Sequence, residues 1–140
     1  MSRILAIDYG VKRCGIAATD PSRIIASGVD TVPTPDLLRY LSTYCKREEV
    51  EKIVIGQVVL ADGSTPPREA DIQLFIKAFN EAFPNIVIDR YDEHYTSQKA
   101  TSIIFNSGAK RKQRQDKALV DKVSAVVILE EYLGWGDFRV

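Results

Sequence analysis

The feature that most constrains the fold is an apolar run near the start of the chain that stops at an acidic residue. Residues 4–7 read Ile-Leu-Ala-Ile and are followed at once by Asp8 and then by Gly10. A run this short is typical of a strand that is buried on both faces of a sheet. An ionised carboxylate beside such a strand is costly unless backbone amides, a basic side chain or a metal ion compensate its charge. The alternative interpretation is that Asp8 is an ordinary turn residue leading into Gly10.

The composition indicates a single globular domain over residues 1–140. Hydrophobic residues make up 45% of the chain and charged residues 27%, which is typical of globular proteins. Because 19 basic residues balance 19 acidic ones, only local charge can point to a nucleic-acid partner. Cys14 and Cys45 show no metal or disulfide spacing, and we find neither a signal peptide nor a membrane-spanning stretch. We therefore expect a cytoplasmic protein with free thiols and no membrane partner.

The order of the expected elements indicates an α/β fold. The expected strands comprise residues 3–9, 14–19, 24–29, 52–56 and 86–91. The expected helices comprise residues 34–49, with Thr34 as the cap, 66–84, 96–106 and 116–133. Short turns join the first three strands, which favours an antiparallel meander, and Gly28 suggests a bulge or an edge strand. The last two strands are each reached through a helix, which favours parallel pairing. The pattern predicts a mixed five-stranded sheet, an antiparallel three-strand meander plus two parallel strands, with four helices.

Three acidic residues fall where these elements end or cover the sheet. Asp8 ends the first strand, Glu93 follows the last one, and Asp121 lies on or beside the apolar stripe of the final helix. Taken alone, Asp121 could pair with Lys117 or Lys122, or turn to solvent. If the elements are neighbours, the three carboxylates converge and each raises the pKa of the others. Oxygen ligands of this kind suit Mg²⁺ or Mn²⁺ better than zinc. Two such ions can activate water and stabilise the leaving oxygen when a phosphodiester is displaced.

Four motifs then occur together. They are Ile7-Asp8-Tyr9-Gly10-Val11-Lys12-Arg13 with Gly15-Ile16-Ala17, Asp62-Gly63-Ser64, Asp92-Glu93 with Thr96-Ser97, and Asp121-Lys122-Val123-Ser124-Ala125 with Ile128-Leu129. With these motifs the chain resembles the YqgF/RuvX family of RNase H-like nucleases over residues 4–133. The resemblance implies a ribonuclease H-like fold and a Holliday-junction-resolvase-like nuclease that processes the 16S rRNA precursor in ribosome biogenesis. By motif position, Asp8, Glu93 and Asp121 match the family's acidic triad. They are therefore the expected catalytic and metal-binding residues, with Mg²⁺ or Mn²⁺ as the cofactor.

The chain departs from the family pattern at two places. His94-Tyr95 stands where the family usually has Arg-Leu, and Gly56-Gln57-Val58 stands where it has Gly-Leu-Pro. Both departures affect the expected substrate contacts more than metal binding, because all three carboxylates are present. His94 is the only histidine; it is either a proton-transfer group or an ordinary loop residue.

Two groups of basic residues are candidates for binding nucleic acid. The first is the dense run of Lys110, Arg111, Lys112 and Arg114, which contains no apolar residue and suits phosphate neutralisation without sequence readout. The alternative is a solvated linker. The second is Lys12 and Arg13, in and just after the turn that follows the first strand, with neutralisation of Asp8 as the alternative.

Three other functions stay open at this point. The chain could be a Holliday junction resolvase in DNA recombination and repair, or a non-catalytic RNA-binding factor of ribosome assembly. The Asp-x-Gly hairpin also occurs in sugar kinases and actin-like ATPases, although these need two such domains around the nucleotide. Nucleic acid is the expected partner, with RNA favoured and a DNA junction possible, together with pre-ribosomal particles. A junction resolvase would favour a homodimer and RNA trimming a monomer.

Overall fold

A computed structural model of the chain describes residues 2–92 and 117–135. Its strands are β1 (Arg3–Tyr9), β2 (Arg13–Thr19), β3 (Ala26–Pro33), β4 (Val50–Gln57) and β5 (Val87–Asp92). Its helices are α1 (Leu37–Arg47), preceded by a 3₁₀ turn (Thr34–Asp36), α2 (Arg68–Ala82) and α5 (Lys117–Tyr132). The expected helix over residues 96–106 lies outside the described residues.

The strands form one sheet in the order β3-β2-β1-β4-β5, which confirms the mixed five-stranded sheet. β1 pairs antiparallel with β2, and β2 pairs antiparallel with β3. β4 is parallel to β1, and β5 is parallel to β4. The carboxyl ends of β1, β4 and β5 therefore lie at the same edge of the sheet, as the sequence argument requires.

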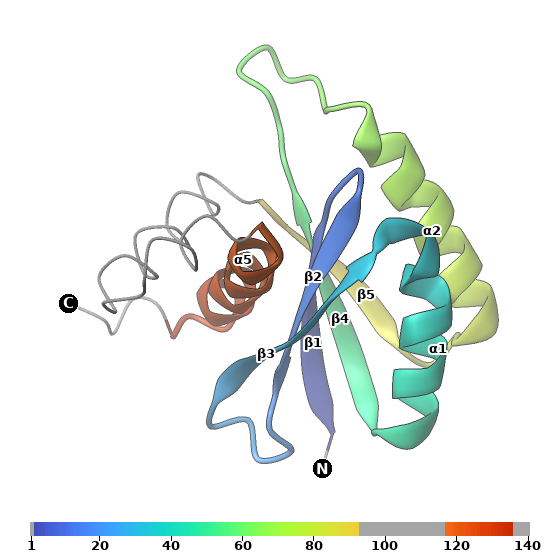
Figure 1. Cartoon of the computed structure of the whole chain (residues 1–140), viewed down its shortest axis with the longest axis vertical. Coiled ribbons are helices and arrows are strands. Elements are labelled where there is room, and N and C mark those ends of the chain that lie inside the picture. The colour runs from blue at the N-terminus through green and yellow to red at the C-terminus, as the bar shows by residue number, and fades with distance from the viewer. Residues whose placement is uncertain (1, 93–116, 136–140) are drawn as a thin grey trace.

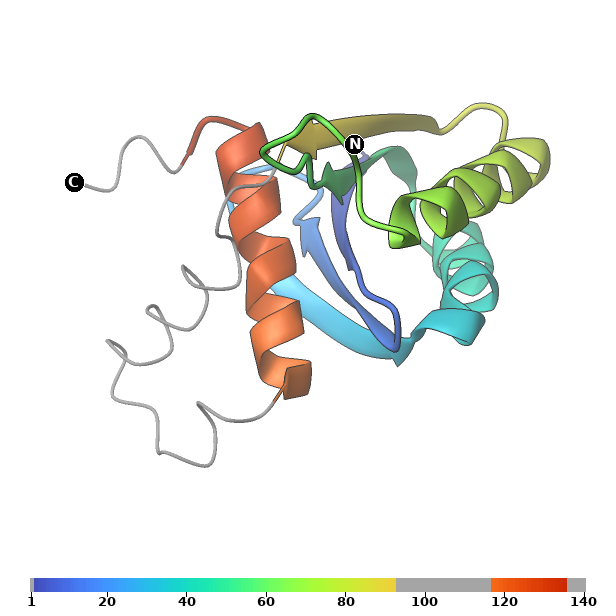
Figure 2. The ribbon, with the colours of Figure 1, turned by 90° about the horizontal axis from the view of Figure 1, so that it is seen from above.

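The sheet is covered on both faces. Helices α1 and α2 lie against one face and α5 lies against the other, as two perpendicular views show (Figures 1 and 2). No helix in the described part of the chain is long and apolar enough to cross a membrane.

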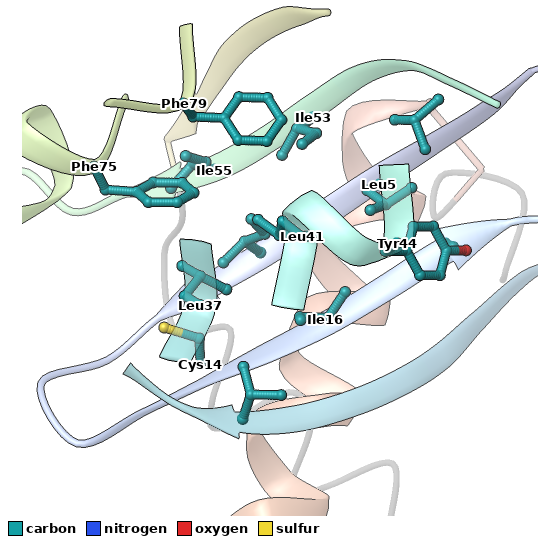
Figure 3. Close-up of a cluster of buried hydrophobic side chains, with 14 of the residues drawn as sticks. Leu5, Cys14, Ile16, Leu37, Leu41, Tyr44, Ile53, Ile55, Phe75 and Phe79 are labelled. Carbon is teal, nitrogen blue, oxygen red and sulfur yellow. The ribbon is translucent and has the colours of Figure 1, made fainter. Parts of the chain in front are cut away.

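Large side chains fill the face under α1 and α2. Leu37, Leu41 and Tyr44 of α1 recur at helical spacing and are buried, and the tilted rings of Phe75 and Phe79 of α2 belong to the same cluster. They pack on inward-pointing strand residues such as Leu5, Ile16, Ile53 and Ile55 (Figure 3). Burial of each such side chain contributes about 1.5–3 kcal/mol, so this layer supplies most of the apolar stabilisation.

The third strand begins later than predicted. We expected residues 24–29, whereas β3 spans Ala26–Pro33. The Asp20 carboxylate accepts hydrogen bonds from the backbone N–H groups of Ile24 and Ile25, at 2.7 and 2.8 Å, and holds them in the turn. Gly28 was expected to mark a bulge or an edge strand, and this prediction is confirmed: β3 is an edge strand, and its pairing with β2 skips Val29, next to Gly28.

Thr34 was expected to cap the first helix, and this prediction was wrong. Asp36 occupies the N-cap position of α1 without a side-chain cap, and Thr34 belongs to the 3₁₀ turn before it. The Thr34 hydroxyl instead donates a hydrogen bond to the Gly10 carbonyl at 2.7 Å, and its N–H donates to the Lys12 carbonyl at 3.0 Å. Thr34 therefore fixes the turn between β1 and β2.

Helix α5 packs on small residues of the other face. A Cβ atom on Gly15 of β2 would lie 1.9 Å from the carbonyl oxygen of Asp121 in α5, so the two backbones are in direct contact there. Ala6 and Ala17 line the same face and meet Ala125 of α5. The helix can approach the sheet this closely because these strand residues have almost no side chain.

We predict that Gly15→Ala destabilises the protein by about 3 kcal/mol or more, because two backbones must separate to admit the methyl group. Chemical denaturation would measure the loss. Gly63→Ala is the matched control: Gly63 has φ of +86° and open space around it, so only backbone strain of about 1 kcal/mol is expected. Equal losses in the two variants would contradict the close packing of α5.

Candidate nuclease site

Asp8 lies near the carboxyl end of β1 on the face that α5 covers. Side chains alternate along a strand, and Ile4 and Ala6, which share the parity of Asp8, belong to the apolar cluster under α5. In the antiparallel pairing of β1 with β2, Asp8 stands opposite Gly15. The acid predicted from the first strand is therefore at the sheet edge where the parallel strands end.

Asp121 lies in the second turn of α5, directly over Gly15. The contact between the Asp121 carbonyl and Gly15 places this helix residue beside the β2 residue that pairs with Asp8. Both carboxylates also act on the same neighbour: burial raises the pKa of the Cys14 thiol, and the charges of Asp8 and Asp121 raise it further. The structure thus brings together two of the three predicted acids, which are distant in sequence.

Arg13 is the ion-pair partner of Asp121. Its Nε donates a hydrogen bond to Oδ2 of Asp121 at 2.6 Å, and both side chains are largely buried, with 32% and 23% of their surfaces exposed. Burial raises the pKa of the Asp121 carboxyl and outweighs the lowering by Arg13 and Lys117. The sequence argument considered Lys117 and Lys122 as partners of Asp121 and missed Arg13.

The other basic residues of the motif have separate places. The aliphatic part of the Lys122 side chain covers Gly28 of β3, so it packs on the sheet. Lys12 is exposed in the turn between β1 and β2. A Cβ atom on Gly10 would lie 2.4 Å from the Arg13 carbonyl oxygen, so this turn is tight and needs glycine.

A second ion pair fixes the sheet edge where β5 ends. Arg90 of β5 binds both carboxylate oxygens of Glu69 in α2 at 2.7 Å, and also donates to the carbonyls of Ile55 and Gly56 in β4. Pairing of β4 with β5 continues to Asp92. Glu93 follows at once in the sequence. Glu93, His94 and the basic residues Lys110, Arg111, Lys112 and Arg114 lie outside the described residues.

The Asp62-Gly63-Ser64 motif forms a turn in the loop between β4 and α2, which projects past the carboxyl end of β4 (Figure 1). The Asp62 carboxylate accepts hydrogen bonds from the N–H and hydroxyl of Ser64, which lower its pKa. Gly63 adopts φ of +86°, which explains the glycine. The motif therefore forms a hydrogen-bonded turn at the same edge of the sheet as Asp8.

The donors in this region suit a hard divalent cation. Asp8 and Asp121 offer carboxylate oxygens, whereas Cys14 points to the opposite face with a raised thiol pKa and is a poor ligand. Within residues 2–92 and 117–135, no three acidic, histidine or cysteine side chains form a metal-binding group. Of the three acids expected as ligands, Asp8 and Asp121 lie in the described part of the chain and Glu93 lies outside it.

The five-stranded mixed sheet with helices on both faces has the ribonuclease H-like fold. The structure is similar to that of T. thermophilus RuvC in complex with a Holliday junction substrate, with a TM-score of 0.57 and 12% identity over 96% of this chain and 98% of that one. It is also similar to Fowlpox virus resolvase with its Holliday junction DNA, with a TM-score of 0.56 and 15% identity over 94% and 97% of the two chains. At this identity the likeness shows the fold.

The chain belongs to the RuvX family, whose model, described as Holliday junction resolvase, matches residues 2–134. A curated relative from Christiangramia forsetii is 45% identical over 95% of this chain and 98% of its own length, and is named "Putative pre-16S rRNA nuclease". Relatives with the same name from Flavobacterium psychrophilum and Bacteroides fragilis are 45% and 43% identical over 95% of this chain and 97% and 96% of their own lengths. The resemblance drawn from the four motifs is confirmed.

We predict that Cys14 reports the charge of both acids. Asp8→Asn or Asp121→Asn removes a negative charge that raises the pKa of Cys14, so we expect the pKa of this thiol to fall in either variant. The Cβ chemical shift of Cys14, followed against pH by nuclear magnetic resonance, would measure the change without requiring the buried thiol to react. Cys45 is the internal control, because burial alone raises its pKa to about 11. An unchanged titration of Cys14 relative to Cys45 in either variant would contradict the placement of that acid.

Proposed function

We propose that this protein is a metal-dependent nuclease that hydrolyses phosphodiester bonds in nucleic acid and processes the 16S rRNA precursor in ribosome biogenesis. The observation that carries the proposal is the meeting of Asp8 and Asp121 over Gly15 at the edge where β5 leads to Glu93. Two partly buried carboxylates at one place cost a fold stability unless a cation compensates their charge, and a binding module has no need for them. Membership of the RuvX family and the names of the relatives support the reaction class and the RNA substrate.

In the proposed reaction, Asp8, Glu93 and Asp121 would hold Mg²⁺ or Mn²⁺. Such an ion, when bound, would lower the pKa of a water and stabilise the charge that develops on the leaving oxygen. Hydrolysis joins the water oxygen to phosphorus, breaks the bridging P–O bond and transfers a proton to the leaving oxygen. The close contact of α5 with β2 holds Asp121 against the sheet edge, which orients the two acids before substrate arrives.

The remaining basic residues would bind the phosphates that flank the scissile bond. Lys12 is exposed on the turn after Asp8 and can reach a nucleic-acid strand that crosses this edge of the sheet. Lys110, Arg111, Lys112 and Arg114 precede α5 in the sequence and would add contacts without base readout. The whole chain acts as a single domain in this proposal, in the cytoplasm and on pre-ribosomal particles, which agrees with its two free thiols.

The second candidate function is a Holliday junction resolvase. The observation in its favour is the description of the family and the likeness to two resolvases solved with junction DNA. A resolvase must place two sites symmetrically on the junction, which requires a two-fold dimer. RNA processing places no such demand on the protein, so the measured oligomeric state separates the two candidates.

We predict that Asp8→Asn, Glu93→Gln and Asp121→Asn each reduce cleavage by roughly 10²–10³-fold or more, because each removes an oxygen ligand with its charge. End-labelled precursor-like RNA, duplex DNA and a four-way junction would be incubated with Mg²⁺, Mn²⁺ or a chelator. Asp71→Asn is the matched control, since Asp71 is exposed on α2 in the layer across the sheet. Preferred cutting of the junction would replace the rRNA assignment with the resolvase.

Two results would overturn the catalytic assignment. One is cleavage by the wild type that persists in the Asp8→Asn variant. The other is tight RNA binding with no cleavage under either ion and no effect of Asp8→Asn, which would make the protein a non-catalytic assembly factor.

We predict that replacing Lys110, Arg111 and Lys112 with Ala weakens RNA binding and flattens its salt dependence by roughly 0.7 per lost contact on a single strand. Fluorescence anisotropy at several salt concentrations would measure the slope. Replacing the exposed Arg39 and Lys46 of α1 with Ala is the control, because both lie on a helix across the sheet from α5. A slope equal to that of the wild type would show that the basic run is a solvated linker.

A further inference from the structure

Arg13 is bound to Asp121 by a single hydrogen bond. Among the described residues, Nε of Arg13 donates to Oδ2 of Asp121, and neither terminal nitrogen of this guanidinium takes part in a hydrogen bond. A guanidinium has five N–H donors, so most of the hydrogen-bonding capacity of Arg13 is unused within this part of the chain.

Arg90 shows how the same protein builds a permanent ion pair. Its guanidinium donates to both oxygens of Glu69 and to two carbonyls of β4, and the two side chains are only 19% and 12% exposed. Arg13 and Asp121 have one such bond and are more exposed, at 32% and 23%. Of these two ion pairs, that of Arg13 with Asp121 has fewer hydrogen bonds and more access to solvent, so it opens more easily.

Asp121 needs a cation in either state of the site. Its carboxyl is half-buried, and Asp8 stands opposite the same glycine that the Asp121 carbonyl covers. Without a divalent ion, a guanidinium within hydrogen-bond distance offsets part of the cost of burying the Asp121 charge. A divalent ion on the same carboxylate would supply the positive charge itself and would then repel Arg13.

We infer that Arg13 is an exchangeable counterion. Arg13 neutralises Asp121 while no divalent ion is bound, and when Asp121 holds an ion Arg13 would turn to contact a phosphate of the nucleic acid. This inference rests on the proposed function, since it assumes that Asp121 is a metal ligand. It makes ion binding and phosphate binding mutually favourable, because a coupling of two equilibria is reciprocal.

The first test follows the N–H of Arg13 Nε in wild-type protein by nuclear magnetic resonance, with assignment by its loss in the Arg13→Lys variant. We expect saturating Mg²⁺ to shift this resonance and remove its protection from solvent exchange. The Nε of Arg90 is the internal control and should not change. Mg²⁺ that binds while the Arg13 resonance keeps its protection would overturn the exchange and leave the nuclease proposal intact.

The second test measures Mn²⁺ affinity without nucleic acid, by electron paramagnetic resonance of the free ion. We expect Arg13→Gln to bind Mn²⁺ about fivefold or more tightly than the wild type, because no guanidinium competes for Asp121. Arg39→Gln, which removes an exposed arginine paired with Asp36, is the matched control and should be unchanged. Weaker or equal binding by Arg13→Gln would instead make Arg13 a positioning residue that orients Asp121.

The third test concerns the released guanidinium. With a non-cleavable single-stranded RNA, the salt slope of binding should increase on addition of Mg²⁺ by roughly 0.7 more in the wild type than in Arg13→Gln. Equal changes would overturn the phosphate contact. Cleavage by the wild type is scored separately, so loss of the nuclease proposal and loss of the exchange give different results. If the protein binds neither Mg²⁺ nor Mn²⁺, both the exchange and the metal-dependent nuclease proposal are wrong.

Discussion

The structure depends on one close contact, that of the α5 backbone with Gly15 in β2. Any side chain at this position would meet the Asp121 carbonyl, so the helix can lie at this depth only over glycine. The small side chains of the neighbouring Ala6 and Ala17 extend this region of close helix–sheet contact along β1 and β2. Because Asp121 is the residue at the point of contact, the depth of the helix determines how near its carboxylate comes to Asp8. A packing constraint thus becomes a constraint on the geometry of the site.

The electrostatics of this contact oppose folding. Burial raises the pKa of Asp121 despite the nearby Arg13, which means that the charged carboxylate remains unfavourable there. Its compensation is one hydrogen bond, whereas Glu69 is held by a bidentate arginine. Natural proteins keep such poorly compensated charge mainly where a ligand or a reaction supplies the missing partner. The difference between these two ion pairs is physical support for a site at Asp121 that does not depend on homology.

Local patterns in the sequence predicted five strands, the mixed pairing of the sheet and the helices over residues 34–49, 66–84 and 116–133, because apolar periodicity and turn residues act over a few neighbours. The predictions were wrong or incomplete where a specific side-chain contact, or a contact between residues far apart in the sequence, determines the local structure. Asp20 draws Ile24 and Ile25 into a turn, and Thr34 binds the Gly10 carbonyl rather than a helix end. The pair of Arg13 with Asp121 joins residues 108 positions apart, which no local pattern contains. The small residues at 15 and 17, alternating along one strand face, were the available signal that a helix packs closely there.

One face of the sheet supplies most of the stability of the fold, and the other face carries the residues of the proposed site. Large apolar side chains under α1 and α2 supply the burial that holds the fold together (Figure 3). Asp8 and Asp121 belong to the opposite face, which α5 covers. The face under α5 carries small residues, the two acids and Arg13. A site with unfavourable charge can persist on this face because the opposite layer offsets its cost. It follows that exchanging a charged residue for a neutral one of similar shape at this site should affect ion and phosphate binding more than folding, whereas added volume at Gly15 should affect both.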